Sequence, residues 1–161
     1  MLTVLTTVLT IVLVAAALVL AAGQAGLFGG KPPSLLGVQG GRLPPPHVTP
    51  NNVHSQAAIW GEQYAHTAIE PLPALADGPQ TVQRLRSLVE TTPGAHVVKA
   101  GPDYLYVQYT TKWLRFVDDA EFWFDPVAQR VQLRSASRLG ESDLGVNRSR
   151  IEALRQRLAS P

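Results

Sequence analysis

The chain opens with a long apolar run and then changes character. Residues 2–22 carry no charged side chain, and the first charged side chain is Lys31. As a helix rising 1.5 Å per residue, this run would be roughly 31 Å long, close to the hydrocarbon thickness of a bilayer. We therefore predict a transmembrane anchor over residues 1–23. A cleavable signal peptide is the alternative, although its apolar core is usually shorter and follows a basic segment.

The next stretch, residues 24–50, is rich in glycine and proline. It contains Gly29-Gly30, Pro32-Pro33, Gly40-Gly41 and Pro44-Pro45-Pro46. Neither a helix nor a sheet ladder propagates through such a sequence. We predict a flexible tether here, which would hold a folded domain of residues 51–161 away from the membrane.

Hydrophobic periodicity predicts two helices and four strands in this domain. The first helix starts near Asp77, which can cap it, and ends before Pro93. A second amphipathic helix begins near Asn147 and would bury one apolar stripe. The β-rich runs between them are 95–99, 104–111, 115–124 and 130–138. The order predicts an α+β fold, a small antiparallel sheet of about four strands with two helices on one face.

Charge and composition exclude several classes of binding partner and chemistry. The 14 basic and 12 acidic side chains give a formal net charge of +2. This balance argues against a nucleic-acid partner, which would need a one-sided basic face. The absence of cysteine excludes disulfides, thiolate metal sites and a cysteine nucleophile. Lys31 and Arg42 follow the apolar run, which by the positive-inside tendency weakly favours a cytoplasmic domain.

Opposite charges concentrate in the hairpin of the third and fourth strands. Asp119 and Glu121 alternate onto one strand face, and they lie within cross-strand reach of Arg134 and Arg138 if the register of the hairpin brings those faces together. One interpretation is an ion-pair lattice that satisfies every arginine internally. The other is a receptor for an anionic or polyol group, in which at least one guanidinium faces a cleft. The receptor would add Ser135, Ser137, Asn147 and Arg148 to these four residues.

Asp118 alternates onto the aromatic face of the third strand, where a carboxylate must be paired or protonated. It is either the buried partner of an arginine or a general acid with a raised pKa. An enzyme of hydrolase type would use Asp118 or Glu121 as its acid or base. However, Gly140-Glu141-Ser142-Asp143-Leu144 lacks the second glycine of a nucleophile elbow.

Metal and cofactor sites are not expected. Asp118, Asp119 and Glu121 cannot all converge on a cation, because neighbouring strand residues point to opposite faces. The four histidines show no metal-ligand spacing, and no dinucleotide or phosphate-loop motif is present.

Several motifs resemble the family called domain of unknown function 1499. They are Pro50-Asn51, Ser55-Gln56-Ala57, Ile69-x-Pro71-Leu72, Val117-Asp118-Asp119-x-Glu121-Phe122 and the block from Arg134 to Arg150. The resemblance implies a bacterial protein with plastid relatives, anchored or lipidated at its N-terminus, with its domain outside the cytoplasm. It implies no established activity. Members typically carry two cysteines where this chain has Pro45 and Asn52.

These observations favour a non-catalytic binding or scaffold module of the cell envelope. We expect a single-pass protein of the bacterial inner membrane with a periplasmic domain. Its partner would be an envelope lipid, glycan or protein that presents an anionic group to Arg134, Arg138 and Arg148. The hydrolase and a purely structural domain are the alternatives.

Overall fold

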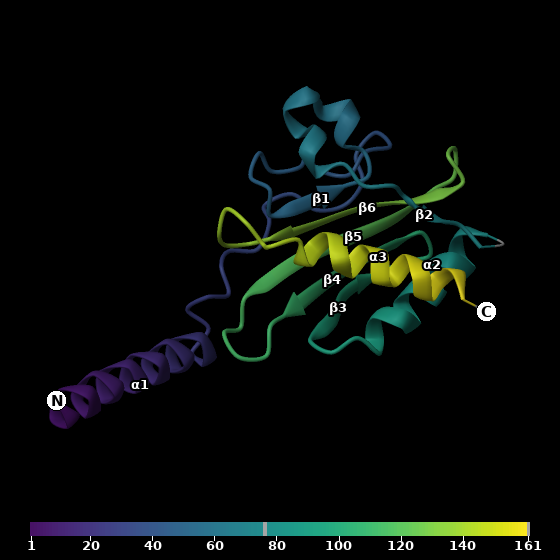
Figure 1. The fold of residues 1–161 in the computed structure, drawn as a ribbon. Coiled ribbons are helices and arrows are strands. Elements are labelled where there is room, and N and C mark those ends of the chain that lie inside the picture. The colour runs from purple at the N-terminus through teal and green to yellow at the C-terminus, as the bar shows by residue number, and fades with distance from the viewer. Residues whose placement is uncertain (76, 161) are drawn as a thin grey trace.

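The N-terminal helix projects away from the rest of the molecule (Figure 1). The structure is a computed structural model that describes residues 1–75 and 77–160. The helix, α1 (Leu2–Gln24), is long and apolar enough to span a membrane or to be a signal sequence. The hydroxyls of Thr6, Thr7 and Thr10 donate to carbonyls one turn earlier in the same helix at 2.8–2.9 Å, so these polar groups are satisfied inside the helix.

One antiparallel sheet forms the centre of the domain, in the order β1-β6-β5-β4-β3, with β2 also pairing with β6. The strands are β1 (Asn52–His54), β2 (Leu72–Pro73), β3 (Ala95–Ala100), β4 (Tyr104–Thr110), β5 (Val117–Asp125) and β6 (Arg130–Ser137). The α+β prediction is confirmed, and the four predicted strands are β3 to β6. The sequence did not reveal β1 and β2, because three and two residues are too short to show an alternation.

Two helices, α2 (Gly78–Glu90) and α3 (Val146–Ala159), cover one face of the sheet (Figure 1). The carboxylate of Asp77 accepts the N–H of Gln80 at 2.8 Å, so the predicted cap is present. Ile151, Leu154 and Leu158 of α3 are buried, as the spacing predicted. They pack with α2 and with the strand residues that alternate toward the helices, including Leu105, Val107, Phe122, Val131 and Leu133.

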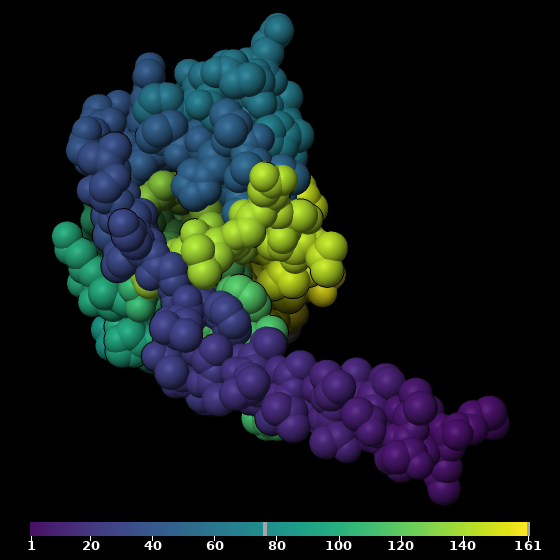
Figure 2. All heavy atoms as spheres, turned by 90° about the vertical axis from the view of Figure 1, so that its left-hand side faces the viewer, coloured from purple at the N-terminus to yellow at the C-terminus, as the bar shows by residue number. Residues whose placement is uncertain are grey.

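The segment after α1 lies along the surface of the domain rather than forming the free spacer predicted from its composition (Figure 2). Leu43 is fully buried against Tyr104, Tyr106 and Trp123, on the sheet face opposite the helices. Proline and glycine prevent regular structure here, but they leave single apolar side chains and backbone groups free to pack. Residues 57–60 and 62–67 form two short 3-10 helices beyond β1.

The C-terminal end of α1 contacts the turn between β4 and β5, residues 111–116. The side-chain amide of Gln24 donates to the carbonyls of Lys112 and Trp113 at 3.2 and 2.8 Å. A Cβ on Gly23 would lie 2.8 Å from the carbonyl oxygen of Leu114, so only glycine permits this approach. The helix is therefore joined to the domain by specific contacts.

Candidate functional site

The sequence predicts nine candidate site residues, and the structure divides eight of them between the two faces of the sheet. Asp119, Glu121, Arg134 and Arg138 form ion pairs on the face opposite the helices, here called the outer face. Asp118, Ser135, Ser137 and Asn147 meet on the face that the helices cover, here called the helix face. The strict alternation of side chains along β5 and β6 requires this division.

On the outer face the predicted ion pairs are present. Glu121 and Arg134 are directly opposed across β5 and β6, and Arg134 donates to the Glu121 carboxylate. Arg138 makes a two-pronged contact with Asp119, at 2.6 and 2.8 Å. The hydroxyls of Tyr104 and Tyr106 donate to Glu121 and Asp119 respectively. Opposite charges therefore balance across the two strands.

The segment before the domain, residues 24–50, covers the ion pairs of the outer face. The N–H of Gly37 donates to Glu121 at 2.6 Å, and Arg134 donates to the carbonyl of Leu35 at 2.8 Å. Glu121 is only 1% exposed, so it cannot reach a substrate as an acid or a base. Both arginines also border a pocket of about 140 Å³, together with Lys31 and His47. The lattice interpretation thus describes the bonding on this face.

On the helix face, Asp118 is paired with Arg150. The guanidinium of Arg150 donates to the Asp118 carboxylate at 2.6 Å and lies 4.2 Å over the ring of Tyr109. Asp118 therefore has the buried arginine partner that the sequence suggested as one of two roles. Arg150 was not among the site residues predicted from the sequence. The sequence contained one indication of its position: Arg150 follows Asn147 by three residues, and residues three apart lie on the same face of a helix.

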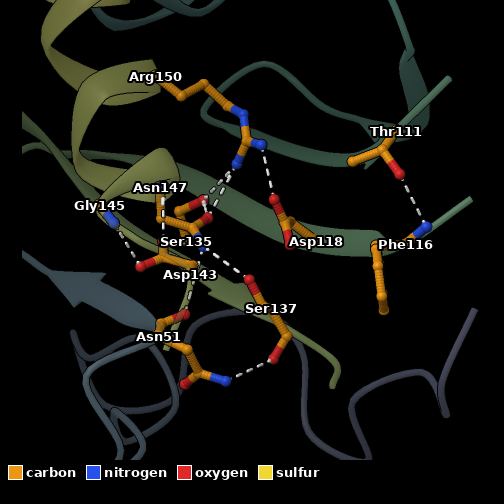
Figure 3. Close-up of polar contacts among 10 residues, drawn as sticks. All are labelled: Asn51, Thr111, Phe116, Asp118, Ser135, Ser137, Asp143, Gly145, Asn147 and Arg150. Carbon is orange, nitrogen blue, oxygen red and sulfur yellow. Dashed lines mark hydrogen bonds and ion pairs between the residues drawn. The ribbon is translucent and has the colours of Figure 1, made fainter. Parts of the chain in front are cut away.

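Asn147 is the centre of the helix-face cluster (Figure 3). It is fully buried, accepts from the Ser135 hydroxyl and from Arg150, and donates to the hydroxyl of Ser137 at 3.1 Å and to the carbonyl of Asn51 at 3.3 Å. This one amide therefore joins β6, α3 and the residue before β1.

Two observations at the start of α3 bear on the receptor interpretation. Arg148 is exposed and donates to the carbonyl of Ala68, so it joins neither Arg134 nor Arg138. The helix start is not available to an external anion either, because the Asp143 carboxylate accepts the N–H groups of Gly145 and Asn147 at 3.0 and 2.7 Å. Partial burial opposes ionisation of Asp143, but these hydrogen bonds outweigh it and hold its pKa below the usual value.

A pocket of about 310 Å³ lies beside this cluster. Its polar lining includes Asp118, Ser137 and Asp143, and its apolar lining includes Phe116 and Leu144. Leu144 is 95% exposed and has a positive φ of 54°, which a leucine rarely adopts. Phe116, which falls within the predicted strand 115–124, precedes β5 instead and stacks on Phe28. The pocket is thus polar toward the sheet and apolar at its exposed edge.

Histidines do not form a metal site in the part of the chain that the structure describes, where no three potential ligands gather. His54 is fully buried between two backbone groups: its Nε2 lies 2.9 Å from the carbonyl of Pro44, and its Nδ1 accepts the N–H of Gln56. Burial lowers the pKa of His54 to about 4, so the ring is neutral at pH 7. Its role is to join two backbone segments.

The residues of both clusters fall within a region that matches a known protein family. The profile described as "Protein of unknown function (DUF1499)" matches residues 42–158, most of the chain. The chain belongs to this family. The match covers the sheet, α2, nearly all of α3 and the ion pairs on both faces of this DUF1499 domain. No curated protein and no solved structure matches the chain.

Proposed function

We propose that this DUF1499 protein is a membrane-anchored, non-catalytic binding module of the cell envelope. Its ligand would be an amphipathic molecule, such as an envelope lipid, held in the 310 Å³ pocket beside the helix-face cluster. The observation that carries the proposal is Leu144, an apolar side chain 95% exposed in a strained backbone conformation at the edge of a pocket. Strain of this kind is retained where it serves a function.

The bonding of the pocket residues favours binding over catalysis. Asp118 is engaged by Arg150, Asp143 by the start of α3, and Ser137 by Asn147. Within residues 1–75 and 77–160, no hydroxyl is hydrogen-bonded to a histidine, so the described part contains no nucleophile and base pair of that type. Fixed polar groups of this kind orient a ligand without reacting with it.

Retention of α1 as an anchor is supported by its contacts. Gly23 and Gln24 pack on and bond to the β4–β5 turn. Both residues belong to the C-terminal end of α1, so a retained helix would fix the orientation of the domain at the membrane. We propose a single span in the bacterial inner membrane, with the domain in the periplasm.

A topology experiment tests the periplasmic placement. Alkaline phosphatase fused after Pro161 is expected to be active in intact bacteria, because the enzyme matures only after export. A fluorescent protein that fails to mature after Sec export, fused at the same position, is expected to stay dark. Fluorescence of the second fusion, with an inactive phosphatase, would place the domain in the cytoplasm and contradict the proposal.

Leu144→Asn tests the pocket. The full chain in lipid nanodiscs is irradiated with a diazirine-bearing fatty acid, and crosslinks to residues 139–146 are quantified by mass spectrometry. We expect about a tenfold loss, since burying a leucine side chain contributes about 1.5–3 kcal/mol. The melting temperature should not fall, because asparagine tolerates a positive φ better than leucine does.

Val127→Asn is the matched control for this variant. Val127 is 93% exposed in the turn between β5 and β6 and does not line the pocket. Its substitution removes a similar apolar surface and should leave crosslinking to residues 139–146 unchanged. Equal crosslinking in the Leu144→Asn and Val127→Asn variants would refute the assignment of the pocket.

A further inference from the structure

A second, larger pocket lies on the other side of the Asp118–Arg150 pair. Its volume is about 650 Å³, and Thr111 borders both pockets. The residues that line it come from the loop between α2 and β3, from β4, from the β4–β5 turn and from α3. The lining includes Gly94, Tyr109, Lys112, Arg115 and Arg150.

The charged side chains that line this pocket are all positive. Lys112, Arg115 and Arg150 line it, and no carboxylate is among its described lining residues. Only Arg150 of these three takes part in a salt bridge of the described chain, with Asp118. Arg157 adds a further positive charge beside the pocket, where its guanidinium donates to Thr91 and Thr92 at 2.7 and 3.1 Å. A group of cations with so little compensation is complementary to an anion.

One residue that lines this pocket, Tyr109, has a buried hydroxyl without a partner in the described part of the chain. Tyr109 is 4% exposed, and its hydroxyl makes no hydrogen bond with any described residue. Burial raises the pKa of Tyr109 to about 12, so the hydroxyl keeps its proton and can donate it to an acceptor. An unsatisfied buried hydroxyl costs stability, and a bound ligand that accepts from it would remove this cost.

The pocket lies next to the end of α1. Lys112 belongs to the turn that Gln24 bonds to, and its ammonium group lies 4.9 Å from the ring centre of Trp113. Trp113 is 64% exposed and Leu27, just after α1, is 71% exposed. Tryptophan and basic residues at the end of an apolar helix are typical of the membrane–water interface. This places the pocket at the depth of lipid headgroups if α1 spans the membrane.

We infer that this basic pocket binds the phosphate group of an anionic glycerophosphate headgroup. Lys112, Arg115 and Arg150 supply the positive charge, and the Tyr109 hydroxyl supplies a neutral donor. The phosphate can come from a membrane phospholipid or from free glycerol phosphate. Its position beside α1 favours the phospholipid, and this part of the inference rests on the proposed anchoring.

Binding is measured on the full chain in dodecyl maltoside micelles. Native mass spectrometry reports retention of phosphatidylglycerol against phosphatidylcholine, and calorimetry reports binding of sn-glycerol 3-phosphate. We expect selective retention of phosphatidylglycerol, with weaker binding of the free phosphate ester at the same site. Binding of the ester without the lipid would overturn the membrane source, and binding of neither would overturn the inference.

The double variant Lys112→Ala/Arg115→Ala should weaken phosphatidylglycerol binding at least about tenfold, because each hydrogen bond to a charged group contributes about 1.5–3 kcal/mol. Arg84→Ala/Arg130→Ala removes the same charge from exposed positions on α2 and β6 and should change binding less than about twofold. Equal weakening by both double variants would mean general charge attraction and would overturn the inference.

Tyr109→Phe separates ligand binding from packing. It keeps the ring under Arg150 and removes only the hydroxyl, so we expect the melting temperature of the free protein to rise or stay unchanged while affinity falls several-fold. Unchanged affinity would overturn the assignment of this hydroxyl to the site. None of these variants alters residues 139–146, so fatty-acid crosslinking should persist in all of them, and failure of this site is distinguishable from failure of the proposed function.

Discussion

Arg134→Ala is expected to lower the free energy of unfolding by about 3–5 kcal/mol, the usual cost of removing one partner of a buried ion pair. The remaining Glu121 is 1% exposed and would keep only the hydroxyl of Tyr104 and the N–H of Gly37 as donors. The segment before the domain covers the Glu121 carboxylate, so the substitution leaves a nearly fully buried charge without its charged partner. The substitution also frees the carbonyl of Leu35, which Arg134 now holds.

Urea unfolding of the full chain in micelles at pH 7 measures this loss. Arg130→Ala is the matched control, since Arg130 lies on the same strand, carries the same charge and is exposed. It should change stability by no more than about 0.5 kcal/mol. A loss below about 1 kcal/mol for Arg134→Ala would show that the pair behaves as a surface salt bridge, and the lattice would then not stabilise the fold.

The β5–β6 hairpin shows what sequence reasoning can predict. Alternation along the two strands correctly placed Asp118 toward the core, and Asp119 and Glu121 on the same face as Arg134 and Arg138. This works because strand periodicity and cross-strand neighbours are local rules. The error was to add residues of both faces to one site, although the same rule forbids it.

Contacts between distant elements were not predictable in the same way. Arg150 meets Asp118 because of the angle at which α3 lies on the sheet, which depends on the packing of Ile151 and Leu154 against the core. The burial of Leu43 on the outer face likewise depends on the path of an irregular segment. Helical spacing places Arg150 on the same helix face as Asn147, but no periodic pattern encodes its contact with Asp118 or the burial of Leu43, so the sequence indicated the elements but not the pockets between them.

Backbone strain gives a further link between the two proposed pockets. Three non-glycine residues of the described chain have a positive φ, namely Arg115, Gln129 and Leu144. Arg115 borders the basic pocket and Leu144 the amphipathic one, and both pockets adjoin the β4–β5 turn where α1 ends. A strained non-glycine residue therefore borders each of the two proposed pockets.

Acidification is expected to destabilise the domain through His54. Burial, and to a smaller extent the charge of Arg134, lowers its pKa from 6.5 to about 4, although the bond to the Pro44 carbonyl opposes the shift. The unfolded chain therefore binds a proton near pH 6.5 that the folded chain does not accept until about pH 4. The stabilising contribution is complete above pH 6.5 and is lost as the pH falls through this window, by about 2–3 kcal/mol at pH 4.5.

The His54→Gln variant isolates this effect from the titration of other groups. The variant loses the buried ring and its two hydrogen bonds, so it should be less stable than the natural chain at pH 7.5. Because glutamine does not titrate, this difference in stability should shrink by about 2–3 kcal/mol at pH 4.5. Urea unfolding across this range measures both curves, with His66→Gln as the control at an exposed position. A stability difference between His54→Gln and the natural chain that stays constant with pH would show that His54 takes up its proton at the same pH in the folded and the unfolded chain, so that the folded ring is charged at pH 4.5. The bond to the Pro44 carbonyl could then persist, because a charged ring still donates from Nε2, but the bond that Nδ1 accepts from Gln56 would be lost.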